Sequence, residues 1–79
     1  MSENADKFWQ SKEEKLKKKI EKVNEIAKTM FFLNTSWEEM QYGKIIKLVD
    51  ANIDKELEFD MLRDAYSFLD GIMYIKERA

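Results

Sequence analysis

The chain has no proline in its 79 residues and only two glycines, Gly43 and Gly71. Proline interrupts a helix because it lacks the N–H donor and its ring clashes with the preceding turn. Glycine weakens a helix through the freedom of its backbone. A chain with so few interruptions favours long continuous helices. We therefore expect an all-α fold that forms a single domain over residues 1–79.

A seven-residue repeat runs through the first part of the chain, with apolar residues in alternating steps of four and three. Its members include Trp9, Leu16, Ile20, Val23, Ala27 and Met30. This spacing places the residues on one stripe of a helix and is typical of a seam that contacts another helix. The helix is expected to end near Leu33. It starts either at Ser11, where Ser11 and Glu14 fit a capping box and residues 1–10 fray, or near Asn4.

Two further helices are expected after the polar corner at residues 34–36. Ser36 and Glu39 fit a capping box, which predicts a shorter second helix that opens at Trp37. Asn52 and Asp54 then offer N-caps for a long third helix, from about Lys55 to Arg78. The sequence thus predicts a three-helix bundle with antiparallel neighbours. One bent helix over residues 37–78 is the alternative.

The third predicted helix carries two neighbouring apolar stripes that together cover about 200° of its circumference, at 100° per residue. The second stripe consists of Leu62, Tyr66, Leu69 and Met73. One neighbouring helix does not cover so wide an arc. A chain of this size also gains little net stability from its own core. Either the third helix is central to the bundle, or its second stripe contacts another chain. Together with the small core, the arc predicts a homodimer with the second stripe as its candidate interface.

Composition excludes several classes of protein. The chain has no cysteine and no histidine, so it lacks disulfides, zinc-binding thiolates and the commonest general base. The formal net charge of −2 disfavours nucleic-acid binding. No apolar run is long enough to span a bilayer, and the N-terminus lacks the apolar core of a signal peptide. We expect a cytoplasmic, non-enzymatic protein without a cofactor.

Residues 50–61 resemble the calcium loop of EF-hand proteins. Asp50, Asn52 and Asp54 fall at the first, third and fifth positions of that loop, and the resemblance implies that they would be the calcium ligands. The match has two departures. Lys55 replaces the glycine of the sixth position, and Met61 replaces the glutamate of the twelfth. Capping of the third helix is the alternative role of these residues.

A lysine-rich stretch follows Phe8 and Trp9. It contains Lys12, Lys15, Lys17, Lys18, Lys19 and Lys22. Basic amphipathic helices with an aromatic anchor bind anionic surfaces, and lysines can also bind nucleic-acid phosphates. However, Glu13, Glu14 and Glu21 interrupt the positive charge. Mixed charge of this kind is typical of a solvated helix face.

The favoured hypothesis is therefore a small interaction or regulatory protein, of the inhibitor or adaptor type, that presents helix faces to another protein. Chains of this size and class occur among phage and mobile-element proteins, an analogy that does not extend to function. Large apolar residues anchor interfaces. The candidates for the interface are Trp9, Phe32, Leu62, Tyr66, Leu69 and Met73. A calcium-binding switch and a lysine-mediated binder of nucleic acid or anionic surfaces are the alternatives.

Overall fold

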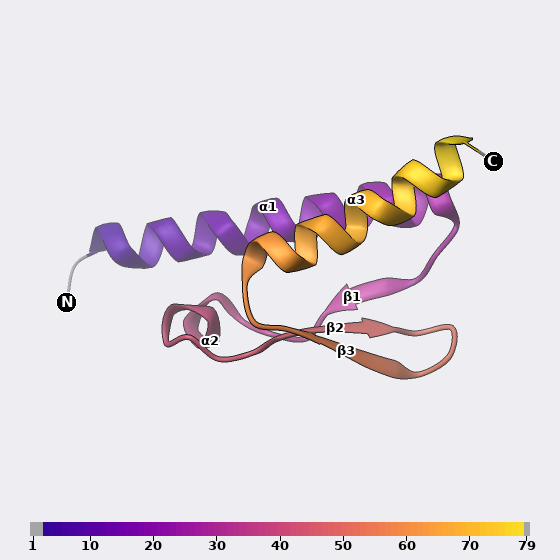
Figure 1. The fold of residues 1–79 in the computed structure, drawn as a ribbon. Helices are drawn as coiled ribbons and strands as arrows, with labels where there is room; N and C mark the ends of the chain where they lie inside the picture. Colours follow the sequence, from indigo (N-terminus) through magenta and orange to yellow (C-terminus); the bar gives the residue numbers. More distant parts are fainter. Residues whose placement is uncertain (1–2, 79) are drawn as a thin grey trace.

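The computed structural model describes residues 3–78, with side chains from residue 6 onward. Two long helices lie over one face of a three-stranded antiparallel sheet, which gives the molecule two layers (Figure 1). The elements in chain order are α1 (Glu3–Ala27), β1 (Phe31–Leu33), α2 (Trp37–Gln41), β2 (Ile46–Asp50), β3 (Lys55–Phe59) and α3 (Leu62–Arg78). The predicted all-α three-helix bundle is therefore wrong, since the chain has an α+β fold.

Helix α1 contains the predicted repeat from Trp9 to Ala27 and buries its later members, whereas Met30 lies beyond the helix and is 57% exposed. Leu16, Ile20, Val23 and Ala27 lie at most 4% exposed. The helix already includes residues 3–10, so Ser11 lies inside it and is not an N-cap. Stripe residues at helical spacing bury together because they share one side of the helix.

The end of α1 differs from the predicted end near Leu33. Lys28 adopts a left-handed backbone with φ of 58°, which stops the helix directly after Ala27. The Asn24 side chain then holds the returning chain, because its carboxamide accepts the N–H of Phe31 and donates to the carbonyl of Phe31, both at 2.9 Å. The apolar run that ended the predicted helix forms strand β1 instead.

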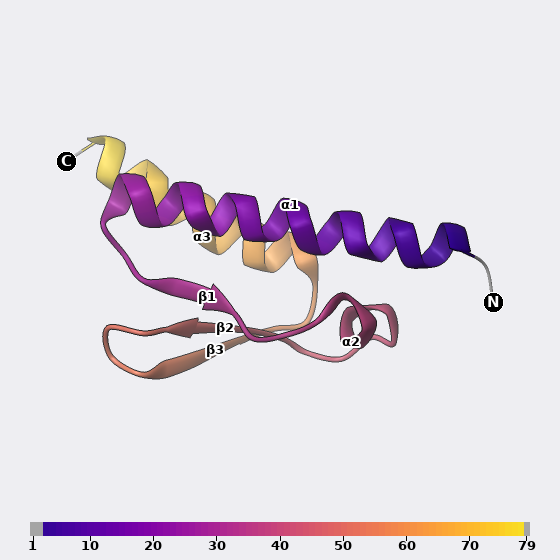
Figure 2. The ribbon, with the colours of Figure 1, turned by 180° about the vertical axis from the view of Figure 1, so that it is seen from behind.

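The strand order is β1–β2–β3, with β2 in the middle (Figure 2). Leu33 pairs with Leu48, which in turn pairs with Leu57 on the other side. Side chains alternate between the two faces of a strand. Accordingly, Ile46 and Leu48 are buried under the helices, whereas the intervening Lys47 lies on the open face.

The predicted second helix is confirmed only for its first turns. Ser36 caps α2 by accepting the N–H of Glu39 at 3.2 Å. Gly43, with φ of 75°, then ends the helix, and its N–H donates to the carbonyl of Met40 at 3.0 Å. A glycine in this conformation is a common helix stop because it has no Cβ to clash. The chain after it becomes strand β2.

The N-caps predicted for the third helix are also wrong. Asn52 and Asp54 lie in the four-residue loop 51–54 that joins β2 and β3 as a hairpin. Asp54 takes the left-handed conformation, with φ of 51°, that such loops commonly contain. Helix α3 consequently begins at Leu62 and not at Lys55.

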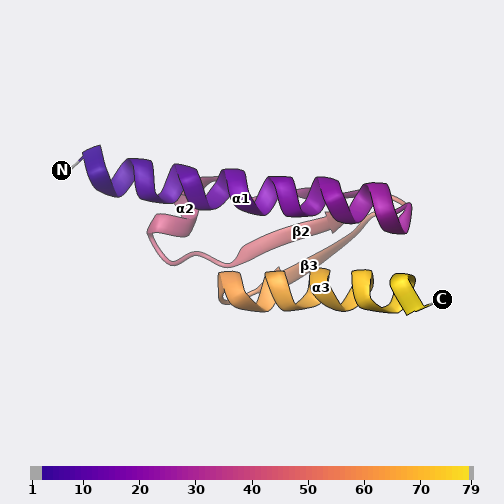
Figure 3. The ribbon, with the colours of Figure 1, turned by 90° about the horizontal axis from the view of Figure 1, so that it is seen from above.

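Helices α1 and α3 run in the same direction, so the predicted antiparallel arrangement is wrong (Figure 3). The chain reverses direction on entering each of the three strands and once more on entering α3. These four reversals bring α3 back parallel to α1. Lys19 and Asp70 form an ion pair between the two helices. Leu16 and Val23 of α1, Leu48 of β2 and Leu69 of α3 are fully buried and form the centre of the core.

Candidate functional site

The N-terminal part of α1 extends beyond the start of α3 (Figures 1 and 3). An apolar hollow lies at that end of the molecule. We call this hollow of about 240 Å³ the notch. Its lining comes from α1, the α2–β2 connection and the β3–α3 corner. The lining residues are Trp9, Met40, Gly43, Lys44, Ile46, Asp60, Met61 and Leu62.

The floor of the notch is rigid because it belongs to the core. Met40 and Ile46 are each 4% exposed. The turn at Gly43 brings these two residues together, since it directs the chain from α2 into β2. Trp9 is half-buried and packs against the core, which fixes its indole on the wall.

The rim of the notch has apolar side chains that reach into solvent. Met61, which lines the notch, is 51% exposed. Phe8 lies outside the lining but contacts Trp9 and is 53% exposed. The Phe8 and Trp9 rings meet edge to face with centroids 5.5 Å apart. The Lys12 ammonium lies 5.0 Å from the centre of the Phe8 ring, a cation–π distance. An apolar surface with a cationic border remains available to a partner.

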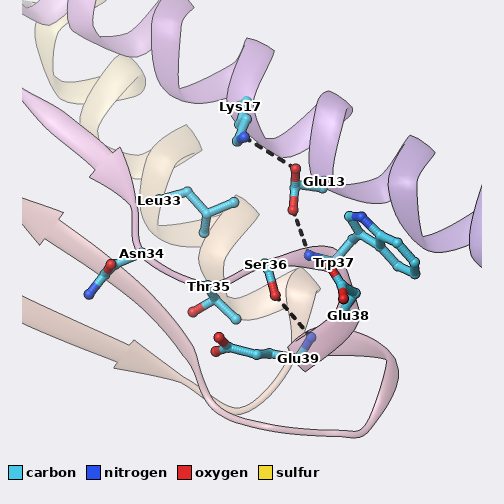
Figure 4. Close-up of a pocket in the computed structure, with 9 residues that line it drawn as sticks. All are labelled: Glu13, Lys17, Leu33, Asn34, Thr35, Ser36, Trp37, Glu38 and Glu39. Atoms are coloured by element: carbon cyan, nitrogen blue, oxygen red, sulfur yellow. Dashed lines mark hydrogen bonds and ion pairs between the residues drawn. The ribbon is translucent and has the colours of Figure 1, made fainter.

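A second hollow, of about 460 Å³, is polar and lies between α1 and the start of α2 (Figure 4). Glu13 accepts the backbone N–H of Trp37 at 2.5 Å with one carboxylate oxygen. Its other oxygen pairs with Lys17 at 3.2 Å. Ser36 caps α2 in the same place. These polar groups bond to one another, so we interpret this hollow as a structural junction between two helices.

The EF-hand-like segment does not lie between two helices, as the calcium loop of an EF-hand does. Asp50, Asn52 and Asp54 instead belong to a hairpin between two strands. The Asp50 carboxylate accepts the N–H of Asn52 at 3.0 Å, which is an ordinary turn interaction. Within residues 3–78, no three His, Cys, Asp or Glu residues come together as a metal site would require.

The structure separates the predicted interface residues into different environments. Trp9 and Leu62 both line the notch. Phe32 is 47% exposed on the open face of the sheet. Leu69 and Met73 are instead buried in the core.

Tyr66 of the same stripe is half-buried, and burial raises the pKa of its phenol, an effect that the nearby Lys19 partly offsets. The second stripe of α3 is therefore core and not an exposed face. It faces α1 and the sheet, whereas the neighbouring stripe is covered only in part, since Met61 and Ile75 are more than half exposed.

The lysine-rich stretch does not act as one patch. Lys17 pairs with Glu13, and Lys19 pairs with Asp70. Lys12 instead joins the aromatic rim of the notch. The sequence did not lead us to Met61 as a site residue. It precedes Leu62 at the corner where α3 starts and is exposed there.

The chain matches no protein-family model, and comparisons with curated proteins and with solved structures find no similar chain. None of the helices that the structure describes is long and apolar enough to cross a membrane. The geometry of the notch is accordingly the main guide to function.

Proposed function

We propose that this protein is a small non-enzymatic binding protein that holds an apolar side chain of a partner protein in the notch. The observation that carries the proposal is the grouping of Phe8 and Met61, both more than half exposed, around the half-buried Trp9. Solvent-exposed aromatic and methionine side chains around a fixed hollow are typical of interface anchors.

The form of the notch favours a peptide segment over a small metabolite. One side is open to solvent along the overhanging part of α1, and the polar groups near the apolar centre are few. A large apolar residue of the partner would insert beside Trp9 and Met61. This arrangement resembles anchor-in-pocket recognition, in which a buried apolar side chain supplies most of the binding energy.

Charges around the notch indicate which residues would flank the anchor residue in the partner. Lys44 and Asp60 line the notch, and Lys12 lies outside the lining, over the Phe8 ring beside Trp9. Two cations against one anion favour carboxylates beside the anchor residue of the partner, since complementary charges raise association rates and specificity. The expected ligand is an apolar residue flanked by aspartate or glutamate.

The non-enzymatic part of the proposal rests on the available side chains. The sequence has no histidine and no cysteine. In the polar hollow, Glu13 is already committed to the N–H of Trp37 and to Lys17. A general base must reach the proton that it removes. Nothing around the notch offers an activated nucleophile.

Selection from a random peptide library displayed on phage tests the proposal. The protein should enrich peptides with a large apolar residue flanked by acidic residues. The double substitution Phe8→Ser and Met61→Ser should weaken the selected peptides at least about tenfold, because two exposed apolar contacts are lost. Tyr74→Ser is the matched control, since Tyr74 is 59% exposed on the C-terminal half of α3.

The result can contradict the proposal in two ways. Selection could enrich no common anchor pattern. Alternatively, the selected peptides could bind equally well to the double variant and to wild type while Tyr74→Ser weakens them. In both cases the notch would not be the binding site.

A further inference from the structure

Strand β3 forms one edge of the sheet, and within residues 3–78 no other strand lies beyond it (Figure 1). The direction of its backbone groups follows from the hydrogen bonds of β2. Asn34 donates to the carbonyl of Lys47, and Ala51 donates to the carbonyl of Met30. The backbone N–H and C=O groups of odd-numbered residues of β2 therefore point toward β1, and those of even-numbered residues point toward β3.

This pattern determines which groups of β3 remain available. Leu48, which faces β3, pairs with Leu57, and the neighbouring pairs follow the same register. Antiparallel strands alternate between residues that bond inward and residues that bond outward. The N–H and C=O groups of Glu56 and Glu58 consequently point away from β2, toward the free edge.

The opposite edge of the sheet, formed by β1, is covered, in contrast to the β3 edge. On β1, the outward N–H and C=O of Phe31 are both bonded by the Asn24 side chain. Strand β1 is also only three residues long. Short length and side-chain cover are ways in which proteins block strand addition. The two edges are therefore unequal, and β3 is the open one.

An apolar side of α3 accompanies this open edge. Phe68 packs on Phe59 of β3 with ring centroids 5.5 Å apart, and Ile72 and Ile75 continue along the helix from Phe68. Exposure increases along this row, because Phe68 and Ile72 are half-buried whereas Ile75 is 66% exposed. Leu57 of β3 is only half-buried as well.

Figure 3 shows how β3 and α3 run relative to each other. Toward its C-terminal end, α3 lies to the side of β3, because the strand crosses from the α1 side of the molecule to the start of α3. A further strand, about 4.8 Å beyond β3, would lie next to this part of the helix. Its inward side chains would cover Leu57 and Ile75.

The charges on the open face determine what kind of strand fits. Glu56 and Glu58 both lie on this face and border the free edge. On their inner side, Lys47 of β2 is the register partner of Glu58, and the Asn34 side chain donates to Glu56 at 3.5 Å. A second copy of β3, paired antiparallel about Leu57, would place Glu56 opposite Glu58 of the partner. Like charges directly opposite destabilise strand pairing. A strand with basic residues at these positions has the complementary charge.

We infer that the β3 edge accepts an extended segment of another protein, in which apolar residues alternate with lysine or arginine. The apolar residues contact Leu57 and the exposed row of α3, and the basic residues pair with Glu56 and Glu58. Main-chain bonds supply affinity and the alternating side chains supply specificity in such strand addition. This surface is separate from the notch and gives the protein a second binding site.

The probe is an eight-residue fluorescein-labelled peptide that alternates valine with lysine. A peptide of the same composition with valines and lysines in two blocks is its control. Fluorescence anisotropy should show at least about fivefold tighter binding of the alternating peptide, because only it matches the two faces of a strand. In hydrogen exchange by NMR, the peptide should protect the amides of Glu56 and Glu58.

Two substitutions separate the main-chain bonds from the charge. Glu58→Pro removes an N–H that points only toward the free edge, a position where an edge strand accepts proline. It should weaken the peptide about tenfold or more, the equivalent of one lost hydrogen bond. Glu58→Gln keeps this N–H and removes the charge, and should weaken the peptide only about two- to fivefold.

Charge reversal provides the sharpest test. The double variant Glu56→Lys and Glu58→Lys should prefer a peptide that alternates valine with glutamate. The inference is overturned if the alternating and block peptides bind equally, or if protection appears elsewhere. A wild-type dimer that Glu58→Pro dissociates would also overturn it, since the occupant would be a second copy. If the proline variant unfolds, amide protection and charge reversal still decide.

Discussion

Glu13 of α1 accepts the backbone N–H of Trp37, the first residue of α2, at 2.5 Å. The first N–H groups of a helix have no partner within the helix. A carboxylate there also interacts favourably with the positive end of the helix dipole. Glu13, a charged residue on the apolar stripe of α1, thus fixes the position of α2, which supplies Met40 to the floor of the notch.

Substitution of Glu13 should destabilise the protein. We expect Glu13→Ala to lower the free energy of unfolding by about 1–3 kcal/mol, because a charged acceptor of a helix N–H is lost. Lys17→Ala removes only the exposed ion pair with Glu13 and should cost less than about 1 kcal/mol. Urea denaturation followed by circular dichroism measures both. Equal effects of the two substitutions would contradict the capping role.

Asn24 should be equally important for strand β1. Its carboxamide bonds both main-chain groups of Phe31 and accepts the hydroxyl of Thr29 at 2.8 Å. Asn24→Ala should lower the free energy of unfolding by about 1–3 kcal/mol, since these partly buried groups lose their partner. Asn52→Ala, in the exposed hairpin loop, is the control and should change it by less than about 0.5 kcal/mol. A small effect at Asn24 would show that water replaces the carboxamide.

Leu69→Glu distinguishes core from interface. Leu69 is 0% exposed within a single chain. A carboxylate at this position would lack water and a partner, so we expect most of the typical 5–15 kcal/mol stability of a domain to be lost. Circular dichroism and light scattering should show an unfolded chain. A folded, helical monomer that replaces a wild-type dimer would instead support an interface on this stripe.

Calcium should have little effect on stability. Millimolar calcium chloride is expected to change the melting temperature no more than magnesium chloride at the same ionic strength, because a ligand that stabilises a fold must bind the native state. Asp50→Ala should respond to calcium as wild type does. A calcium-specific increase that Asp50→Ala abolishes would indicate a site in the hairpin loop.

Tyr66 predicts a dependence of stability on alkaline pH. Burial raises the pKa of its phenol above the usual 10.0, so the folded state holds the proton more tightly than the unfolded state. The contribution is complete below pH 10 and decreases as pH rises, because the unfolded state loses the proton first. The stability difference between wild type and Tyr66→Phe should therefore shift against wild type above pH 10. Denaturation at pH 8 and pH 11 measures it.

The sequence allowed the features that depend on local spacing to be predicted. The seam of α1 repeats over several turns, and a pattern of that length places residues on one side of a helix whatever lies opposite. The Ser36 cap was predictable for the same reason, because it joins residues only three apart. Trp9 was predicted to lie on the seam of α1, and it packs against the core.

The strands could not be predicted in the same manner. Short apolar runs fit a buried helix and a strand equally well, and Ile46, Leu48 and Leu57 belong to such runs. A run of five residues is too short to distinguish the two-residue period of a strand from the 3.6-residue period of a helix. The absence of proline then favoured helices, although hairpin loops can form without it, as Asp54 shows.

The sequence alone determined which side of α1 is apolar and where the cap of α2 forms, because these depend on neighbours within a few residues, whereas it misplaced the end of α1 and the start of α3. Only the tertiary structure decided what covers the apolar sides of the helices. It buried Leu69 under α1 and the sheet, and it left Met61 and Ile75 exposed. Local spacing specifies the direction of a side chain along its own element, whereas the packing of distant elements specifies whether that side chain meets protein or solvent.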